Sequence, residues 1–95
     1  MKKKHFYVIA YDIADDKRRN KVVKVLEKVG NRVNFSVFEC LLTDIQYNKV
    51  YAQLEKLAVK REDYINIYHL CTECFARTVY IPTQRPKIAP KIVVV

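Results

Sequence analysis

Apolar and polar positions first divide the chain into a strand-like segment and a helix-like segment. The apolar run within residues 5–12 is rich in aromatic and β-branched side chains, which predicts a buried strand. Asp15 and Asp16 then supply the capping and the negative charge that favour the start of a helix. Gly30, the only glycine in the chain, is predicted to end that helix in the left-handed conformation. The inner face of the helix is formed by Val22, Val25, Leu26 and Val29.

The following segments predict a second helix and further strands. Residues 32–42 alternate and then become apolar, which predicts a strand. Thr43 and Gln46 have the spacing of a capping box at the start of a helix. Residues 64–71 predict a third strand and residues 77–81 a fourth. The apolar stripe of the second helix comprises Tyr47, Val50, Tyr51, Leu54, Leu57 and Ala58.

We assign the chain to an α+β, ferredoxin-like fold of order βαββαβ, the split βαβ arrangement. Each helix has one apolar face, so the two helices can cover one side of a four-stranded antiparallel sheet. The other side then lacks an internal cover and would carry Tyr7, or Tyr64 and Tyr68, depending on the register. An open aromatic face is expected to bind a second copy of the chain or nucleic-acid bases.

The C-terminal segment forms a separate unit. We expect residues 1–81 to make one ferredoxin-like domain and residues 82–95 to make a tail. Three prolines punctuate residues 82–90, and residues 91–95 are predicted to be a short strand. A strand with no hairpin partner either adds to a sheet edge, for example that of a second subunit, or frays.

The charge of the chain indicates the kind of partner. Eighteen Lys and Arg against ten Asp and Glu give a net charge of +8, which favours a polyanion, and nucleic acid first among polyanions. The apolar face of the first helix is too narrow for a membrane surface, and no stretch approaches the ~20 apolar residues of a membrane span. Three cysteines, an odd number, fit a reducing compartment, and we expect a cytoplasmic protein.

Asp12 is the main candidate for chemistry, because it stands between the apolar run and the basic residues 17–21. A carboxylate there can hold Mg²⁺, with water and substrate phosphate completing the coordination, and the ion would polarise a phosphodiester. The alternative is that Asp12, Asp15 and Asp16 only cap the helix and face solvent. One aspartate supplies few ligands for a metal ion. The metal-binding interpretation therefore works better if two copies of the chain bring two Asp12 residues together.

The basic residues after Asp12 are candidates for binding nucleic acid. Arg18 lies in line with the inward stripe and would point to the sheet end that carries Asp12, where it either steers phosphate or pairs with Asp12; the sequence slightly favours pairing. Arg19 and Lys21 flank it and could contact backbone phosphates. Lys17 belongs to an outer lysine stripe, a pattern typical of a solvated face. The candidate nucleic-acid-binding residues are Lys17, Arg18, Arg19, Lys21 and Arg32.

Two cysteines three positions apart allow a metal or redox interpretation. Cys71 and Cys74 with His69 give three candidate zinc ligands, and Cys40 is a remote fourth. The chain has no second CxxC pair, and the pair does not follow a βαβ unit as in a thioredoxin-like site. Two plain turn cysteines are therefore the favoured interpretation.

Taken together, several sequence blocks resemble one known family. Residues 11–13, 15–22 and 30–39, in this order and spacing, are similar to the small CRISPR-associated endoribonuclease family, the smaller subunit of the universal spacer-acquisition pair. Residues 63–68, continuing through the two turn cysteines, are also similar to many members. The resemblance covers roughly residues 5–81.

The resemblance implies a homodimer whose uncovered sheet faces pack together and whose C-terminal strand crosses to the partner subunit. It also implies a Mg²⁺ or Mn²⁺ ion between the two copies of Asp12. The positions at which the family has residues that influence nuclease activity are occupied here by Tyr11, Arg19, Arg32 and Phe38. Lys21 stands where some members have arginine, and it keeps the charge without the bidentate fork.

The function implied is CRISPR adaptation by a metal-dependent endonuclease that hydrolyses phosphodiester bonds of RNA or double-stranded DNA. The alternative is a non-catalytic, DNA-binding scaffold that bridges two dimers of the CRISPR-associated integrase. The family motif does not separate these two cases, although the residues lean towards an enzyme. A toxin-type ribonuclease is a further option. An RRM-like RNA-binding module is disfavoured, because residues 62–69 lack the glycine of its signature.

Overall fold

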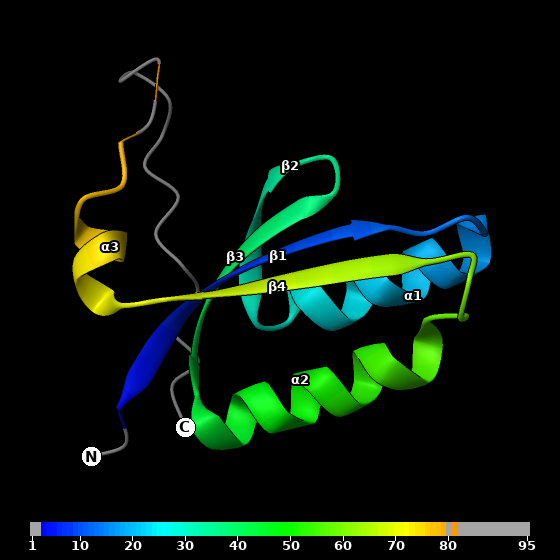
Figure 1. Cartoon of the computed structure of the whole chain (residues 1–95), viewed down its shortest axis with the longest axis horizontal. Coiled ribbons are helices and arrows are strands. Elements are labelled where there is room, and N and C mark those ends of the chain that lie inside the picture. Colours follow the sequence, from blue (N-terminus) through cyan, green and yellow to red (C-terminus); the bar gives the residue numbers. More distant parts are fainter. Residues whose placement is uncertain (1–2, 80, 82–95) are drawn as a thin grey trace.

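The computed structural model of the chain describes residues 3–79 and 81 (Figure 1). Helices and strands alternate in the order β-α-β-β-α-β, followed by one short helix, so the predicted ferredoxin-like order is confirmed. The elements are β1 (Lys4–Asp12), α1 (Asp16–Glu27), β2 (Gly30–Asn34), β3 (Val37–Thr43), α2 (Asp44–Leu57), β4 (Tyr64–Leu70) and α3 (Thr72–Ala76).

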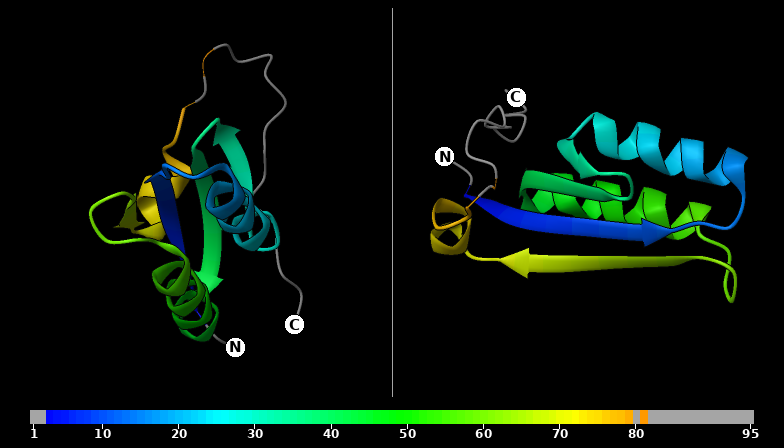
Figure 2. Two further views of the ribbon diagram at one scale, coloured as in Figure 1. Left: turned by 90° about the vertical axis from the view of Figure 1, so that its right-hand side faces the viewer. Right: turned by 90° about the horizontal axis from the view of Figure 1, so that it is seen from above.

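The four strands form one antiparallel sheet in the order β2-β3-β1-β4, with β1 and β3 in the centre. Helices α1 and α2 lie together on one side of this sheet (Figure 2), which we call the helix face; the other side is the open face. The core fills the space between the helix face and the two helices. Its fully buried side chains include Ile9, Val22, Leu26, Phe38 and Leu42.

Both long helices begin at the capping residues that the sequence predicted. The Asp15 carboxylate accepts a hydrogen bond from the backbone N–H of Arg18 at 2.9 Å. At α2, Thr43 and Gln46 form the reciprocal capping box. These bonds satisfy backbone N–H groups that have no partner inside the helix. The N-terminal ends of both helices are thereby fixed.

Two of the strand predictions were wrong. Residues 32–42 are not one strand, because a turn at residues 35–36 divides them between β2 and β3. The Asn34 side chain accepts the Phe35 N–H at 2.7 Å, a local bond that stabilises a tight turn. Residues 77–79 and 81 form no strand, since the chain after β4 turns into α3 and the Arg77 N–H extends this turn by donating to the Glu73 carbonyl.

The prediction for Gly30 was also wrong. Gly30 has no positive φ angle; it is the first residue of β2, and α1 has already ended at Glu27. A Cβ atom at Gly30 would collide with the Cys40 Sγ and would lie 2.6 Å from the Glu39 carbonyl oxygen. Glycine is required here because two strands approach closely, and a left-handed turn plays no part.

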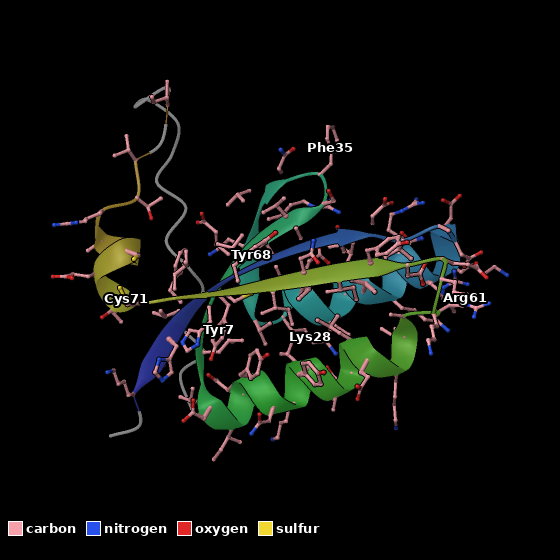
Figure 3. The ribbon with its side chains drawn as sticks, in the orientation of Figure 1. Tyr7, Lys28, Phe35, Arg61, Tyr68 and Cys71 are labelled. Atoms are coloured by element: carbon pink, nitrogen blue, oxygen red, sulfur yellow. The ribbon has the colours of Figure 1, made fainter. Side chains whose placement is uncertain are left out.

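The register decides which tyrosines lie on the open face. Tyr7 points to the helix face, where its ring stacks on that of Tyr47 at a centroid distance of 4.6 Å (Figure 3). Asp12 pairs with Tyr64, and Val8 pairs with Tyr68, so these four side chains share the open face. Tyr64 is 64% exposed and Tyr68 is 53% exposed. The open aromatic face therefore belongs to β4.

The predicted tail, residues 82–95 with its strand at residues 91–95, lies outside the residues that the structure describes. Among the described helices, none combines the length and the apolar composition that crossing a membrane requires.

Candidate functional site

Asp12 is the last residue of β1 and lies on the open face, opposite Tyr64 of β4. Its side chain is exposed at the point where the chain leaves the sheet to start α1. Within residues 3–79, no side chain or backbone group forms a hydrogen bond or ion pair with the Asp12 carboxylate. The carboxylate is therefore free to accept a ligand from outside the chain.

A second carboxylate, that of Asp63, fixes the loop that follows Asp12. Asp63 is buried and accepts the backbone N–H of Ala14 at 2.9 Å, the backbone N–H of Val59 at 2.8 Å and the Arg18 Nε at 2.9 Å. The Arg18 hydrogen bond, followed by the two backbone donors, holds the pKa of Asp63 well below its ordinary value. The ionised carboxylate thus ties the β1–α1 loop to the α2–β4 loop.

Arg18 does not pair with Asp12, and this prediction was wrong. Its guanidinium forms ion pairs with Asp63 at 2.9 Å and with Glu62 at 3.2 Å. The inward direction of Arg18 was predicted correctly, but its partner comes from 45 residues further along the chain. No spacing rule links such distant positions, so this pairing could not be predicted from the sequence.

Arg19 turns back towards the loop next to Asp12. It donates to the Asp16 carboxylate at 2.6 Å and to the Ile13 carbonyl at 3.0 Å, and Ile13 directly follows Asp12. The Arg19 side chain remains 42% exposed, which leaves part of the guanidinium accessible. Lys17 and Lys21 are exposed on the same helix, so the first turns of α1 present cations beside this end of the sheet.

Tyr11, Arg32 and Phe38 form one cluster on the helix face. The Tyr11 hydroxyl donates to the Phe35 carbonyl at 3.0 Å and accepts a hydrogen bond from Arg32 at 3.1 Å. The Arg32 guanidinium carbon lies 5.6 Å from the centroid of the Phe38 ring. Strand alternation places Tyr11 and Asp12 on opposite faces, so this cluster lies behind the strand end that carries Asp12.

The five residues predicted to influence catalysis are thus divided between two groups. Asp12 is on the open face, and Arg19 lies beside the loop that follows it. Tyr11, Arg32 and Phe38 instead hold the β2–β3 hairpin against β1. Residues 3–79 contain no group of three or more His, Cys, Asp or Glu side chains that could hold a metal. A single carboxylate suits a hard cation such as Mg²⁺ only if water, phosphate or a second copy supplies the remaining ligands.

The zinc interpretation of the two turn cysteines loses its fourth ligand. Cys40 is fully buried in the core, and burial raises the pKa of its thiol to about 12.

Asp63 is the functional residue that sequence reasoning missed. Its only sequence signal is an acidic residue directly before the apolar alternation of β4.

Comparisons with known proteins agree with this architecture. The profile of the family described as "CRISPR associated protein Cas2" matches residues 5–78. A CRISPR-associated endoribonuclease Cas2 of Rhodospirillum rubrum is 44% identical over 88 residues, which cover 86% of this chain and 71% of that protein. The chain therefore belongs to the Cas2 family of CRISPR-associated proteins.

Solved structures support the same assignment. Cas2 of Streptococcus pyogenes matches with a TM-score of 0.71 and 27% identity, covering 80% of this chain and 98% of that one. A chain of the structure titled "Partial Cas6-RT-Cas1--Cas2 complex" matches with a TM-score of 0.66 and 26% identity, covering 81% and 90% of the two chains. The family and the ferredoxin-like fold predicted from the sequence are both confirmed.

Proposed function

We propose that this chain acts in CRISPR adaptation as a metal-dependent endonuclease of RNA or double-stranded DNA. The observation that carries the proposal is the exposed Asp12 carboxylate, which has no partner within residues 3–79 and lies beside the cations of α1. A charge without a partner at a strand end contributes little to folding. It is available to a divalent cation, and Mg²⁺ or Mn²⁺ would there polarise a phosphodiester and lower the pKa of a bound water.

The proposed active form is a homodimer. The open face carries the exposed tyrosines Tyr64 and Tyr68, and β4, on which they lie, is an edge strand of the sheet. Packing two open faces around a two-fold axis would bury these rings and bring two Asp12 residues towards one ion. The second copy would thus supply the carboxylate that one chain lacks.

We assign different roles to the remaining candidate residues. Arg19, Lys17 and Lys21 would contact substrate phosphates, because they are exposed or partly exposed near Asp12. Arg18 is held by Asp63 and would act by fixing the loop. The helix-face cluster Tyr11, Arg32 and Phe38 would support the strand end on which Asp12 lies.

The test is cleavage of labelled RNA and of labelled duplex DNA, with Mg²⁺, with Mn²⁺ and with EDTA. Asp12→Asn should lower cleavage by about a hundredfold or more. Asp44→Asn is the matched control, since Asp44 is an exposed carboxylate at the start of α2. Equal cleavage by the wild type and Asp12→Asn would indicate a contaminating nuclease and would contradict the proposal.

A scaffold that holds duplex DNA against the integrase is the second candidate. It is favoured by the similarity to a chain in a complex that contains Cas1, and by the net charge of +8 per chain. If several phosphates are contacted, DNA affinity should fall about tenfold or more for a few-fold rise in salt. A pure scaffold predicts that Asp12→Asn leaves spacer acquisition in cells intact; loss of acquisition with the complex still assembled would contradict it.

A further inference from the structure

The opposite end of the sheet brings two thiols together. Cys71 follows the last residue of β4, and Cys74 lies one turn further along in α3 (Figure 3). Their sulfur atoms are 3.1 Å apart, and the Cys74 backbone N–H donates to the Cys71 sulfur at 3.4 Å. Both cysteines are exposed. The sequence favoured two plain turn cysteines, but the folded chain makes them a preformed dithiol.

The two thiols differ in reactivity. When Cys71 is ionised, its sulfur can accept hydrogen bonds from the thiol and the backbone N–H of Cys74, and these bonds lower the pKa of Cys71. The same pairing raises the pKa of Cys74. The thiolate is the nucleophile in disulfide exchange, so Cys71 should attack first and Cys74 second.

The surroundings of Cys71 leave room for a reagent. A pocket of about 370 Å³ borders Cys71 and is also lined by Lys3, His5, His69, Leu70 and Thr72. Lys3 and the two imidazoles can interact with the carboxylates of a small acidic molecule. Cys40, by contrast, is fully buried in the core and cannot meet a reagent in the folded chain.

We propose that Cys71 and Cys74 form a redox-active dithiol that low-molecular-weight disulfides, such as glutathione disulfide, oxidise to an intramolecular disulfide. The Cys71 thiolate attacks one sulfur of glutathione disulfide, forming a mixed disulfide and releasing one glutathione thiolate. Cys74 gives its proton to solvent and attacks the Cys71 sulfur, which releases the second glutathione. One disulfide is reduced and one is formed, so the electrons balance. The pocket receives the incoming disulfide.

The test uses the full chain, reduced and then exposed to mixtures of reduced and oxidised glutathione. After an acid quench and alkylation with N-ethylmaleimide, mass spectrometry should show that the peptide with both cysteines has lost two hydrogens and carries no glutathione. Cys40 should be alkylated only after unfolding. A stable glutathione adduct on the wild type, or disulfide-linked dimers on a non-reducing gel, would overturn the proposal.

Three single substitutions separate the roles of the cysteines. Cys74→Ser should stop at a glutathione adduct on Cys71, because the resolving thiol is absent. Cys71→Ser should react about tenfold more slowly, since only the thiol with the raised pKa remains. Cys40→Ser is the matched control and should behave as the wild type. Equal rates in Cys71→Ser and Cys74→Ser would remove the assignment of Cys71 as nucleophile. Nuclease activity is not a readout, so failure of the proposed function leaves this test unaffected.

Discussion

The two faces of the sheet show how adjacent residues acquire different roles. On the helix face, Tyr11 and Phe38 are buried, and the Tyr11 hydroxyl donates to one group and accepts from another inside the chain. On the open face, Tyr64 and Tyr68 are more than half exposed, and Asp12 has no partner within residues 3–79. Tyr11 and Asp12 are neighbours in sequence, yet one is used by the fold and the other is available to a ligand.

The same contrast holds between the two carboxylates at this end of the sheet. Asp63 has no exposed side-chain surface and accepts two backbone N–H groups and a guanidinium. A buried charge that is fully hydrogen-bonded stabilises one arrangement of the loops, whereas an exposed charge without partners costs the fold little. We therefore expect substitutions at Asp63 to affect stability and substitutions at Asp12 to affect function.

The largest effect on stability is expected for Asp63→Ala. The change leaves Arg18 and the backbone N–H groups of Ala14 and Val59 without their acceptor. The Tm should fall by about 15–20 °C, because breaking a buried pair is strongly destabilising. Glu62→Ala is the matched control, since Glu62 is an exposed partner of the same guanidinium, and its Tm should change by only a few degrees. A similar fall in Tm in both variants would contradict the conclusion that the buried Asp63 carboxylate holds the two loops together.

Acidification should remove the contribution of Asp63. The folded chain holds the pKa of Asp63 below its value of about 3.9 in an unfolded chain, so the unfolded state binds more protons and stability rises with pH. The difference in unfolding free energy between the wild type and Asp63→Asn should be constant above about pH 5 and shrink below about pH 4. Urea unfolding across this range measures it. A difference that does not change with pH would show that Asp63 is not ionised in the fold.

Gly30→Ala should have the next largest effect. A methyl group would meet the Glu39 carbonyl oxygen at 2.6 Å, and this backbone atom cannot move without disturbing β3. We expect a loss of about 2 kcal/mol in the free energy of unfolding, measured with urea. Combining Gly30→Ala with Cys40→Ala relieves only the sulfur contact, so it should recover only part of the loss. Full recovery of the free energy of unfolding would show that the clash with the Cys40 side chain, and not the clash with the Glu39 carbonyl oxygen, causes the loss.

Tyr11→Phe tests whether the helix-face cluster supports the fold or takes part in cleavage. The change removes the bond to the Phe35 carbonyl and the acceptor of Arg32, which should cost about 1–1.5 kcal/mol. Cleavage rates well below the melting temperature should stay within a few-fold of the wild type. A loss of cleavage as large as that of Asp12→Asn would mean that the Tyr11 hydroxyl contacts substrate. The assignment of a structural role to the helix face and a catalytic role to the open face would then be wrong.

Asp12→Asn should have the smallest effect on stability. The carboxylate has no partner within residues 3–79, so the free energy of unfolding should change by less than about 0.5 kcal/mol. Differential scanning calorimetry without divalent cations provides the measurement. Adding Mg²⁺ or Mn²⁺ should then raise the Tm of the wild type and leave that of Asp12→Asn unchanged, because only the wild type offers the ligand. A marked destabilisation of the variant would show that the Asp12 carboxylate stabilises the fold.

Local sequence signals were sufficient for much of the fold. The capping residues Asp15 and Thr43 and the helical stripes of Val22 and Leu54 act over one or two turns, so they could be predicted without tertiary information. The turn at residues 35–36 was missed because Asn34 and Ser36 are the only residues typical of a turn in an otherwise strand-like run, and neither glycine nor proline is present there. The strand predicted at residues 77–81 is not formed at residues 77–79 and 81, where the chain leaves α3 and the Arg77 N–H makes a helical hydrogen bond to the Glu73 carbonyl.

The sequence by itself determined the capped starts of both long helices, the excess of positive charge and the carboxylate at the end of β1, because each depends on composition or on residues that are close together in the chain. Only the tertiary structure decided that Arg18 pairs with Asp63, that Tyr68 and not Tyr7 lies on the open face, and that Gly30 lies against Glu39 and Cys40. These outcomes depend on strand register and on contacts between distant segments. A one-residue shift in register would exchange the two faces of a strand, so a local pattern does not fix them.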